Sequence, residues 1–267
     1  MQKKTRTGFA AGFRGLLLLL TGLSVQAVQA AGFSAAVSPP RFELKAQSGQ
    51  VVRQVLEIYN MSNADEQYDI RSNDWNLQGD NLTFSEALTP DSCRPWVKLE
   101  RRRVTVRKAD KRGFRFEVHV PPGTPAQECR FALLVEGLSP APNRIGGNLN
   151  LPANGRLAVI VYLSIGDAAP RLNIQTIRMA GGKALLQVSN QGLAHGRLQG
   201  TLAGTDARGQ ALDFSVSSMP VMPGETRLLE LTPHLNGKRH TGALTAPLHL
   251  KGNLYWNEGA FAIDKRV

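Results

Sequence analysis

The cysteines and histidines of this chain are the residues whose chemistry is simplest to test. Cys93 and Cys129 are its only cysteines, and an even pair in an exported protein most simply forms one disulfide. On the chain-entropy model, closing a loop of about 37 residues stabilises a fold by roughly 4 kcal/mol. A metal site would need further soft ligands nearby. The five histidines are scattered, at positions 119, 195, 234, 240 and 249. We therefore expect a Cys93–Cys129 bridge, no metal and no cofactor.

Motifs of catalytic sites are missing from the sequence. It contains no G-x-S-x-G nucleophile elbow, no H-E-x-x-H zinc motif, no phosphate-binding G-x-x-x-x-G-K-[ST] and no dinucleotide fingerprint at the start of a helix. Carboxylates such as Glu57 and Asp69 do not indicate an active site, because solvent-facing strands carry such residues equally often. Sandwich folds do carry hydrolases, so the missing motifs leave that alternative open. We expect a protein without catalytic residues or enzymatic activity.

Basic residues are in excess, and the net charge is +11. Ten lysines or arginines lie between Arg94 and Arg115, including the run Arg101–Arg103. A polyanion-binding patch is one interpretation. Solvated strand faces are the better one, because apolar residues alternate with the charges and Trp96 is the only aromatic residue from 94 to 111. We therefore expect no nucleic-acid partner.

The first thirty residues have the three parts of a secretory signal. Four basic residues precede the apolar stretch Leu16–Leu23, and small residues follow at 28–30. The apolar stretch has roughly ten residues, which is too short for the ~20 that a membrane-spanning helix needs. We expect residues 1–30 to be removed, which lowers the net charge from +11 by four to +7. The mature chain is then exported without stable membrane insertion, and an uncleaved anchor is the alternative.

From residue 31 onward the sequence has the pattern of short β-strands. Residues 114–120 alternate with period two, and 131–135 form a short apolar run typical of a buried strand. A composition break at 166–170 divides the chain into 31–166 and 167–267. Strand candidates in the second part are 172–177, 184–188, 197–202, 212–216, 226–231 and 248–256. We predict an all-β protein of two tandem immunoglobulin-like sandwiches.

The segment from Gly146 to Ile165 reads as an extended edge strand. Alternating apolar residues precede a Pro-Ala-Asn-Gly break, and an almost uninterrupted aliphatic run follows it. A strand needs partners for its N–H and C=O groups, and its apolar face needs cover. Its later half is expected to be an ordinary buried strand of the first sandwich. Its earlier half is expected to be free to pair with another chain.

Several segments resemble the periplasmic chaperones of chaperone–usher pilus assembly, the PapD-like family. The resemblance covers nearly all of the mature chain and rests on the order and spacing of its pieces. In the first domain these are VSPPRFEL at 37–44, LEIYNMSN at 56–63, QYDIRSNDW ending at 75, CRFALLVEG at 129–137 and NGRLAVIVYL at 154–163. In the second domain they are LLQVSNQG at 185–192, VMPGETR at 221–227 and LKGNLYWN at 250–257.

The resemblance implies a periplasmic chaperone with its two domains set in a boomerang arrangement. Such a protein binds pilin or fimbrial subunits in the cleft and hands them to an outer-membrane usher. Each subunit lacks its last strand, and the chaperone completes the sheet with an edge strand of its own, which is β-augmentation. The residues implied to lend their side chains are Ile145, Leu149 and Leu151, with a possible continuation through Leu157 and Val159.

The family also has two basic residues that bind the subunit's C-terminal carboxylate. A guanidinium suits this role because its fork can donate two charge-assisted hydrogen bonds. Arg41 matches the first of these residues. Arg156 matches the second by its spacing from the lending residues, whereas an alignment on Tyr162 places Val159 there instead.

A different class of function is an exported sandwich that is structural or binds a carbohydrate at the cell surface. Such a protein would gather aromatic side chains on one exposed face. Aromatic residues are only 6% of the chain, and Trp75, Trp96 and Trp256 are dispersed along it. The chaperone is therefore the preferred interpretation.

Overall fold

The structure, a computed structural model, describes residues 34–138, 141–145, 149–153 and 155–267. For 141–145 and 149–153 only the backbone is described. The predicted signal at 1–30 lies outside these residues. Among the described residues, no helix is both long and apolar enough to cross a bilayer.

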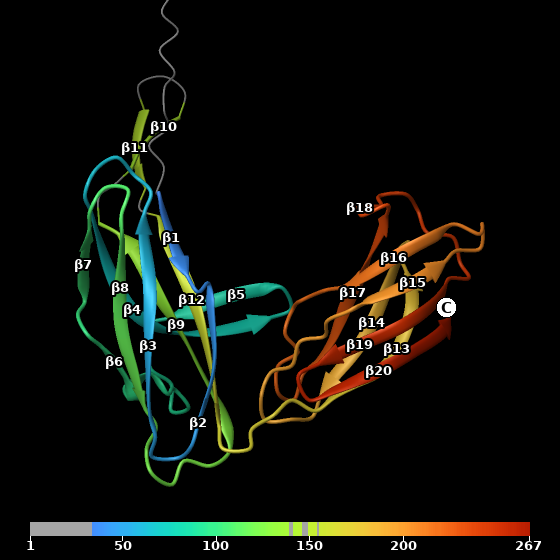
Figure 1. Ribbon diagram of the computed structural model, residues 1–267, viewed down its shortest axis with the longest axis horizontal. Coiled ribbons are helices and arrows are strands. Elements are labelled where there is room, and N and C mark those ends of the chain that lie inside the picture. Colours follow the sequence, from blue (N-terminus) through green and yellow to red (C-terminus); the bar gives the residue numbers. More distant parts are fainter. Residues whose placement is uncertain (1–33, 139–140, 146–148, 154) are drawn as a thin grey trace, which may run out of the picture. The chain divides into compact units, whose positions relative to one another are not determined.

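The first sandwich has two main sheets (Figure 1). One has the order β1-β3-β8-β6, formed by Ala35–Ser38, Val51–Asn60, Lys111–His119 and Val97–Leu99. The other has the order β2-β12-β9-β4-β5, formed by Arg41–Ala46, Arg156–Ile165, Gln127–Gly137, Glu66–Gln78 and Asn81–Ser85, and β7 (Arg103–Val106) also pairs with β4. A separate hairpin consists of β10 (Ala141–Ile145) and β11 (Leu149–Ala153).

Alternating side chains build the core between these two sheets. Phe114 and Phe116 of β8 are buried, whereas Arg115 between them is exposed. The Phe116 ring makes edge contacts with Phe42 at 5.2 Å and with Phe131 at 6.3 Å, measured between centroids. The period-two prediction for this segment is confirmed, because a sheet with one solvated face sorts its side chains in this way.

Strand β9 is buried on both faces, which explains its continuous apolar run. Phe131, Leu133 and Val135 point into the core of the first sandwich. Ala132 and Leu134 point the other way, into a second apolar cluster completed by Trp75, Tyr162 and Met222. Met222 lies beyond the last strand of the first sandwich, so this cluster joins the two sandwiches.

The predicted disulfide is confirmed. Cys93 lies directly before the 3-10 turn η1 (Arg94–Trp96), and it is bonded to Cys129 in β9. Both cysteines are buried in the first core. The bond fixes the long connection between β5 and β6 to a central strand.

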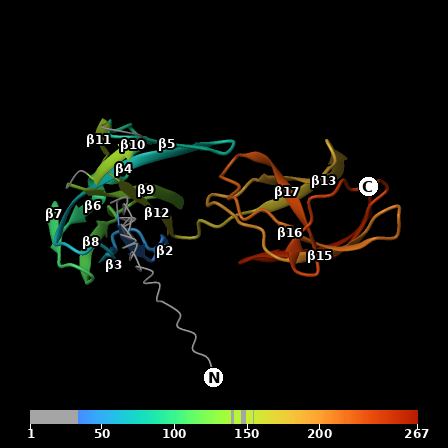
Figure 2. The ribbon, with the colours of Figure 1, turned by 90° about the horizontal axis from the view of Figure 1, so that it is seen from above.

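The second sandwich is one eight-stranded sheet that curls around its own core (Figure 2). Its order is β13-β14-β17-β16-β15-β19-β20, and β18 pairs with β17. The strands are Leu172–Ala180, Lys183–Asn190, Thr226–Leu235, Ala211–Val216, Thr201–Thr205, His249–Trp256, Gly259–Arg266 and, for β18, Lys238–Arg239. Leu186 and Leu229 from one half meet Leu202 and Leu250 from the other. The prediction of an all-β protein with two tandem sandwiches is confirmed, whereas the boomerang arrangement stays a prediction.

The strand expected at 197–202 is wrong in its first part, because β15 begins only at Thr201. Gly200 has a φ of +122° and its Cα lies close to the carbonyl of Asn253, where a Cβ would come within 2.5 Å of the oxygen. This conformation favours glycine and interrupts a regular strand. Residues 191–200 therefore form an irregular segment with two isolated bridges, one from Gln199 to Tyr255 of β19 and one from Gly196 to Val221 in the connection between β16 and β17.

Candidate functional site

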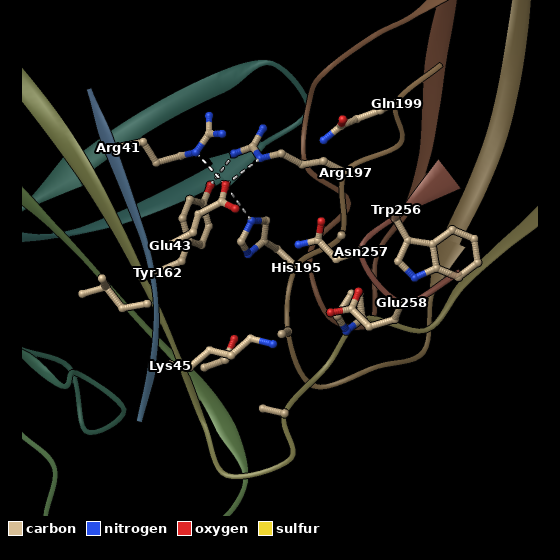
Figure 3. Close-up of a pocket in the computed structure, with 16 residues that line it drawn as sticks. Arg41, Glu43, Lys45, Tyr162, His195, Arg197, Gln199, Trp256, Asn257 and Glu258 are labelled. Atoms are coloured by element: carbon tan, nitrogen blue, oxygen red, sulfur yellow. Dashed lines mark hydrogen bonds and ion pairs between the residues drawn. The ribbon is translucent and has the colours of Figure 1, made fainter. Parts of the chain in front are cut away.

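A cavity of about 210 Å³ lies where strands β2 and β12 meet the irregular segment of the second sandwich. Charged and aromatic side chains line it (Figure 3): Arg41, Glu43, Lys45, Tyr162, His195, Arg197, Trp256 and Glu258. The cavity combines cations from both sandwiches with a carboxylate between them. Such an arrangement is suited to binding an anionic group.

Strand β2 places two of these charges by simple alternation. Phe42 points into the core, so Arg41 and Glu43 on either side of it point outward, toward the cavity. The strand runs parallel to β12, with Arg41 opposite Ile160 and Glu43 opposite Tyr162. The register therefore fixes both charges beside the aromatic ring of Tyr162.

A buried asparagine holds the segment that carries the opposite wall. The Asn190 side chain donates hydrogen bonds to the carbonyls of Ala194 (2.8 Å) and Val221 (2.9 Å). Its oxygen accepts hydrogen bonds from the backbone N–H groups of Arg171 (3.0 Å) and Gly192 (2.9 Å). Asparagine side chains commonly replace backbone partners at such turns. The backbone that leads to His195 and Arg197 is thereby fixed.

Arg197 is held on two sides. Its Nη1 donates to the carbonyl of Ser218 at 2.6 Å, and its Nη2 donates to the Tyr162 hydroxyl at 3.1 Å. The guanidinium also lies over the Tyr162 ring, 5.6 Å from its centroid. The side chain is only 17% exposed, and this burial lowers the pKa of Arg197 below its ordinary value. The cation is therefore oriented by the protein and poorly hydrated.

Glu43 is the carboxylate at the centre of the site. Its Oε1 lies 2.6 Å from Arg41 Nε, 3.6 Å from Arg197 Nε and 3.7 Å from His195 Nε2. The neighbouring His195 ring is the largest cause that lowers the pKa of Glu43, to about 2, and the arginines add to this effect against the opposing effect of burial. Glu43 is therefore ionised at any physiological pH.

His195 connects the two sandwiches through Glu128 of β9. Glu128 Oε2 accepts a hydrogen bond from the His195 backbone N–H at 2.9 Å and lies 2.6 Å from the ring Nδ1. The side chains are 9% and 1% exposed. The ring also stacks on Tyr162, with 3.7 Å between the centroids. This buried pair orients the second sandwich's segment against the first sheet at the cavity.

The first four residues of β12 have a free edge next to this cavity. Strand β9 pairs with all of β12, whereas β2 pairs only with Ile160–Ile165. Among the described residues no strand pairs with Arg156–Val159 on that side. Before Pro39 and Pro40 the chain is in β1, which pairs with β3 in the other sheet. The open edge is therefore about 13 Å long, at ~3.3 Å per residue.

The residues predicted from the sequence lie in different surroundings. Arg41 lines the cavity, but Arg156 does not. Arg156 begins β12 and forms an ion pair with Glu136 at 3.1 Å. It precedes Ile160, the partner of Arg41, by four residues, which is about 13 Å along a strand. The structure therefore does not bring the two predicted anchors together.

The predicted lending residues divide into three groups. Ile145 lies opposite Leu149 in the β10–β11 hairpin, which also contains Leu151 and pairs with neither main sheet in the described part of the chain. Leu157 is half-buried at the rim of the first core. Val159 is fully buried within that core, so its side chain is not available to another protein in this structure. This corrects the predicted continuation through Val159.

Sequence reasoning missed the three charged or titratable residues nearest to Arg41 and to one another in the cavity: Glu43, His195 and Arg197. Glu43 could have been found, because it lies two positions after Arg41 in an alternating strand and so shares its face. His195 and Arg197 could not, because more than 150 residues separate them from Arg41 in the sequence and no local pattern connects the two segments. Only the packing of the second sandwich on the outer face of the first brings them there.

Comparisons with known proteins give matches only among solved structures. No family model matches the chain, and no curated protein matches it. The YadV chaperone structure is 12% identical over 88% of this chain and 100% of that one, with a TM-score of 0.49. The Escherichia coli chaperone DraB is 13% identical over 88% and 96%, with a TM-score of 0.47. The Salmonella enterica SafB chaperone, solved with the SafA pilin, is 12% identical over 86% and 97%, with a TM-score of 0.46. All three solved structures are of chaperones, and one of them was solved with a pilin.

Proposed function

We propose that this protein is a periplasmic chaperone that binds pilin subunits through donor-strand complementation and delivers them to an outer-membrane usher. The role is one of binding, without catalysis. The signal at 1–30 would provide export. The free edge of β12 would provide the pairing surface, and the cavity at its end would bind the terminal carboxylate of the subunit.

The observation that carries this proposal is the direction of the free edge. Strand β2 occupies the β12 edge from Ile160 onward and runs parallel to β12, beginning at Arg41. A guest strand on Arg156–Val159 that runs in the same direction would reach the start of β2 with its C-terminal end. Its terminal carboxylate would then meet the outward-facing guanidinium of Arg41. The free edge and the cation thus fit the last strand of a protein.

Apolar residues in β12 and in the preceding β10–β11 hairpin support a lent strand. Leu157 packs only partly against its own core, so its remaining surface can join the core of a guest. Ile145, Leu149 and Leu151 lie in a two-stranded hairpin, and such a hairpin alone is marginally stable in water. Little free energy would therefore oppose its opening to pair with a subunit that lacks a strand.

Coexpression in a bacterial periplasm tests the proposal. We expect a soluble one-to-one complex with a small exported subunit encoded beside this gene, isolated by affinity purification and size-exclusion chromatography. Arg41→Ala should abolish the complex while the melting temperature of the isolated protein stays nearly unchanged, because exposed ion pairs contribute little to stability. Arg53→Ala is the matched control, since Arg53 is also an exposed strand arginine paired with a glutamate, Glu117.

Three results would contradict the proposal. A subunit that accumulates equally well without this protein would show that it needs no chaperone of this kind. Loss of the fold in Arg41→Ala would show that the arginine is structural, and a complex that survives the substitution would remove the carboxylate site from the mechanism.

A further inference from the structure

The Nε of Arg197 is a buried hydrogen-bond donor that points toward the centre of the cavity. Its Nη1 and Nη2 donate hydrogen bonds to Ser218 and Tyr162, but its buried Nε has no hydrogen-bond acceptor among the described residues. The carboxylate of Glu43 lies in that direction (Figure 3), at 3.6 Å, which is beyond a normal hydrogen bond. A buried donor without an acceptor costs free energy. A carboxylate placed closer would remove this cost.

The Glu43 carboxylate lies closer to the guanidinium of Arg41 than to that of Arg197. It lies 2.6 Å from Arg41 Nε and a full ångström further from Arg197 Nε. The Glu43 side chain is 39% exposed and the Arg41 side chain 45%, so both have room to rotate. Arg197, by contrast, is fixed by its two hydrogen bonds. The movable partners of the site are therefore the glutamate and Arg41.

We infer that Arg197 is the second cation of the carboxylate site, and that Glu43 occupies in the free protein the position that the partner's terminal carboxylate takes in the complex. This inference rests on the proposed function. Arg197 takes the role that the sequence assigned to Arg156, which forms an ion pair with Glu136 outside the cavity. Both sandwiches then contribute a cation to the site, Arg41 from the first and Arg197 from the second.

Competition with Glu43 limits the affinity of the site for the partner's terminal carboxylate. Two guanidiniums without a counterion would repel each other, and Glu43 offsets this repulsion while the site is empty. Because Glu43 stays ionised, an incoming carboxylate must displace it or share the two cations with it. Lys45 and Glu258 also line the cavity. Their opposite charges offset each other, so the net charge of the site is set by Arg41, Glu43 and Arg197. Removing the charge of Glu43 should therefore strengthen binding of an external carboxylate.

Peptide binding at neutral pH tests the inference. The probes are two fluorescently labelled peptides of alternating valine and threonine, one ending in a free carboxylate and one in an amide, and binding is followed by fluorescence anisotropy. We expect the wild type to prefer the carboxylate peptide. Glu43→Gln should increase that preference about tenfold, and Arg197→Gln should decrease it about tenfold with little change for the amide peptide. Arg53→Gln in β3, the matched control, should leave the preference unchanged, because Arg53 is an exposed arginine paired with Glu117 away from the cavity.

The outcomes separate this inference from the proposed function. If the wild type binds both peptides equally and Arg41→Ala has no effect, the carboxylate site of the proposed function is overturned, and the inference with it. If Arg41→Ala removes the preference but Arg197→Gln does not, the proposed function stands and Arg197 is not the second cation. If Glu43→Gln weakens binding of the carboxylate peptide, Glu43 positions Arg41 instead of holding the partner's place. Circular dichroism of each variant shows whether the fold is kept, and Arg197→Lys, which keeps the charge but not the fork, should bind between the wild type and Arg197→Gln.

Discussion

The buried pair between His195 and Glu128 should connect the stability of this protein to pH. His195→Ala removes a hydrogen bond to a charged group, worth about 1.5–3 kcal/mol. It also removes the stacking on Tyr162, worth about 0.5–1.5 kcal/mol. Glu128 is 1% exposed, so water cannot easily replace the lost ring. We expect the substitution to lower the free energy of unfolding by about 2–4 kcal/mol.

The sign of the pH dependence follows from the groups around the imidazole. Burial, the largest single influence, lowers the pKa of His195, but hydrogen bonding to Glu128 and Glu43 more than offsets it despite the nearby Arg197. The pKa in the folded protein therefore lies above the ordinary value of 6.5. A group whose pKa is raised by folding stabilises the protein fully below its unfolded pKa. The proton-linked part of the stabilisation should disappear as the pH rises through the folded pKa.

Guanidinium unfolding of the oxidised protein at pH values from 5.5 to 8.5, followed by tryptophan fluorescence, measures this effect. The difference between wild type and His195→Ala should be largest at the acid end and decrease toward the alkaline end. His249→Ala is the matched control, because its ring lies at the same 2.6 Å from a carboxylate, that of Asp264, but the side chains are 50% and 61% exposed. An exposed pair should contribute less than about 1 kcal/mol. Equal effects of the two substitutions, or a difference that grows with rising pH, would refute the reasoning.

Two further predictions concern stability. Replacing Cys93 and Cys129 together by alanine should lower the free energy of unfolding by roughly 3–4 kcal/mol, since the bond closes a long loop; an unchanged guanidinium midpoint under oxidising conditions would contradict this. Asn190→Ala removes four side-chain hydrogen bonds that hold the segment before Arg197 and should cost about 2–4 kcal/mol. Asn173→Ala on the exposed face of β13 should cost less than about 0.5 kcal/mol, and equal melting temperatures for the two variants would show that the buried amide is not needed.

Much of the fold could be predicted because its signals are local. Alternation of apolar and charged residues around Phe114 identified a strand with one solvated face, and the two cysteines identified their own bond. The segment at 197–202 was mistaken for a strand because Leu198 and Leu202 are both core residues. A close approach to Asn253, which no local pattern reveals, takes Gly200 and its neighbours out of the ladder.

The candidate site was predictable only in part. The PPRFEL segment indicated Arg41, and strand alternation places Glu43 on the same face. The choice of Arg156 as a second cation depended on spacing along one strand. Val159 was assigned to the lending face, although the core of the first sandwich buries its side chain.

The sequence by itself determined the two sandwiches and the disulfide, since each depends on alternation, composition or residue type within a short stretch, and the family resemblance pointed to Arg41. The tertiary structure decided which strand edge stays open and which cation faces Arg41. Both depend on contacts between segments far apart in the chain. Strand β2 pairs only with Ile160–Ile165 of β12 and leaves Arg156–Val159 without a partner on that side in the described part of the chain. Asn190 fixes the segment that brings Arg197 to Glu43. These contacts are set by strand pairing within the first sandwich and by the packing of one sandwich on the other, and a single sequence carries no local signal for either.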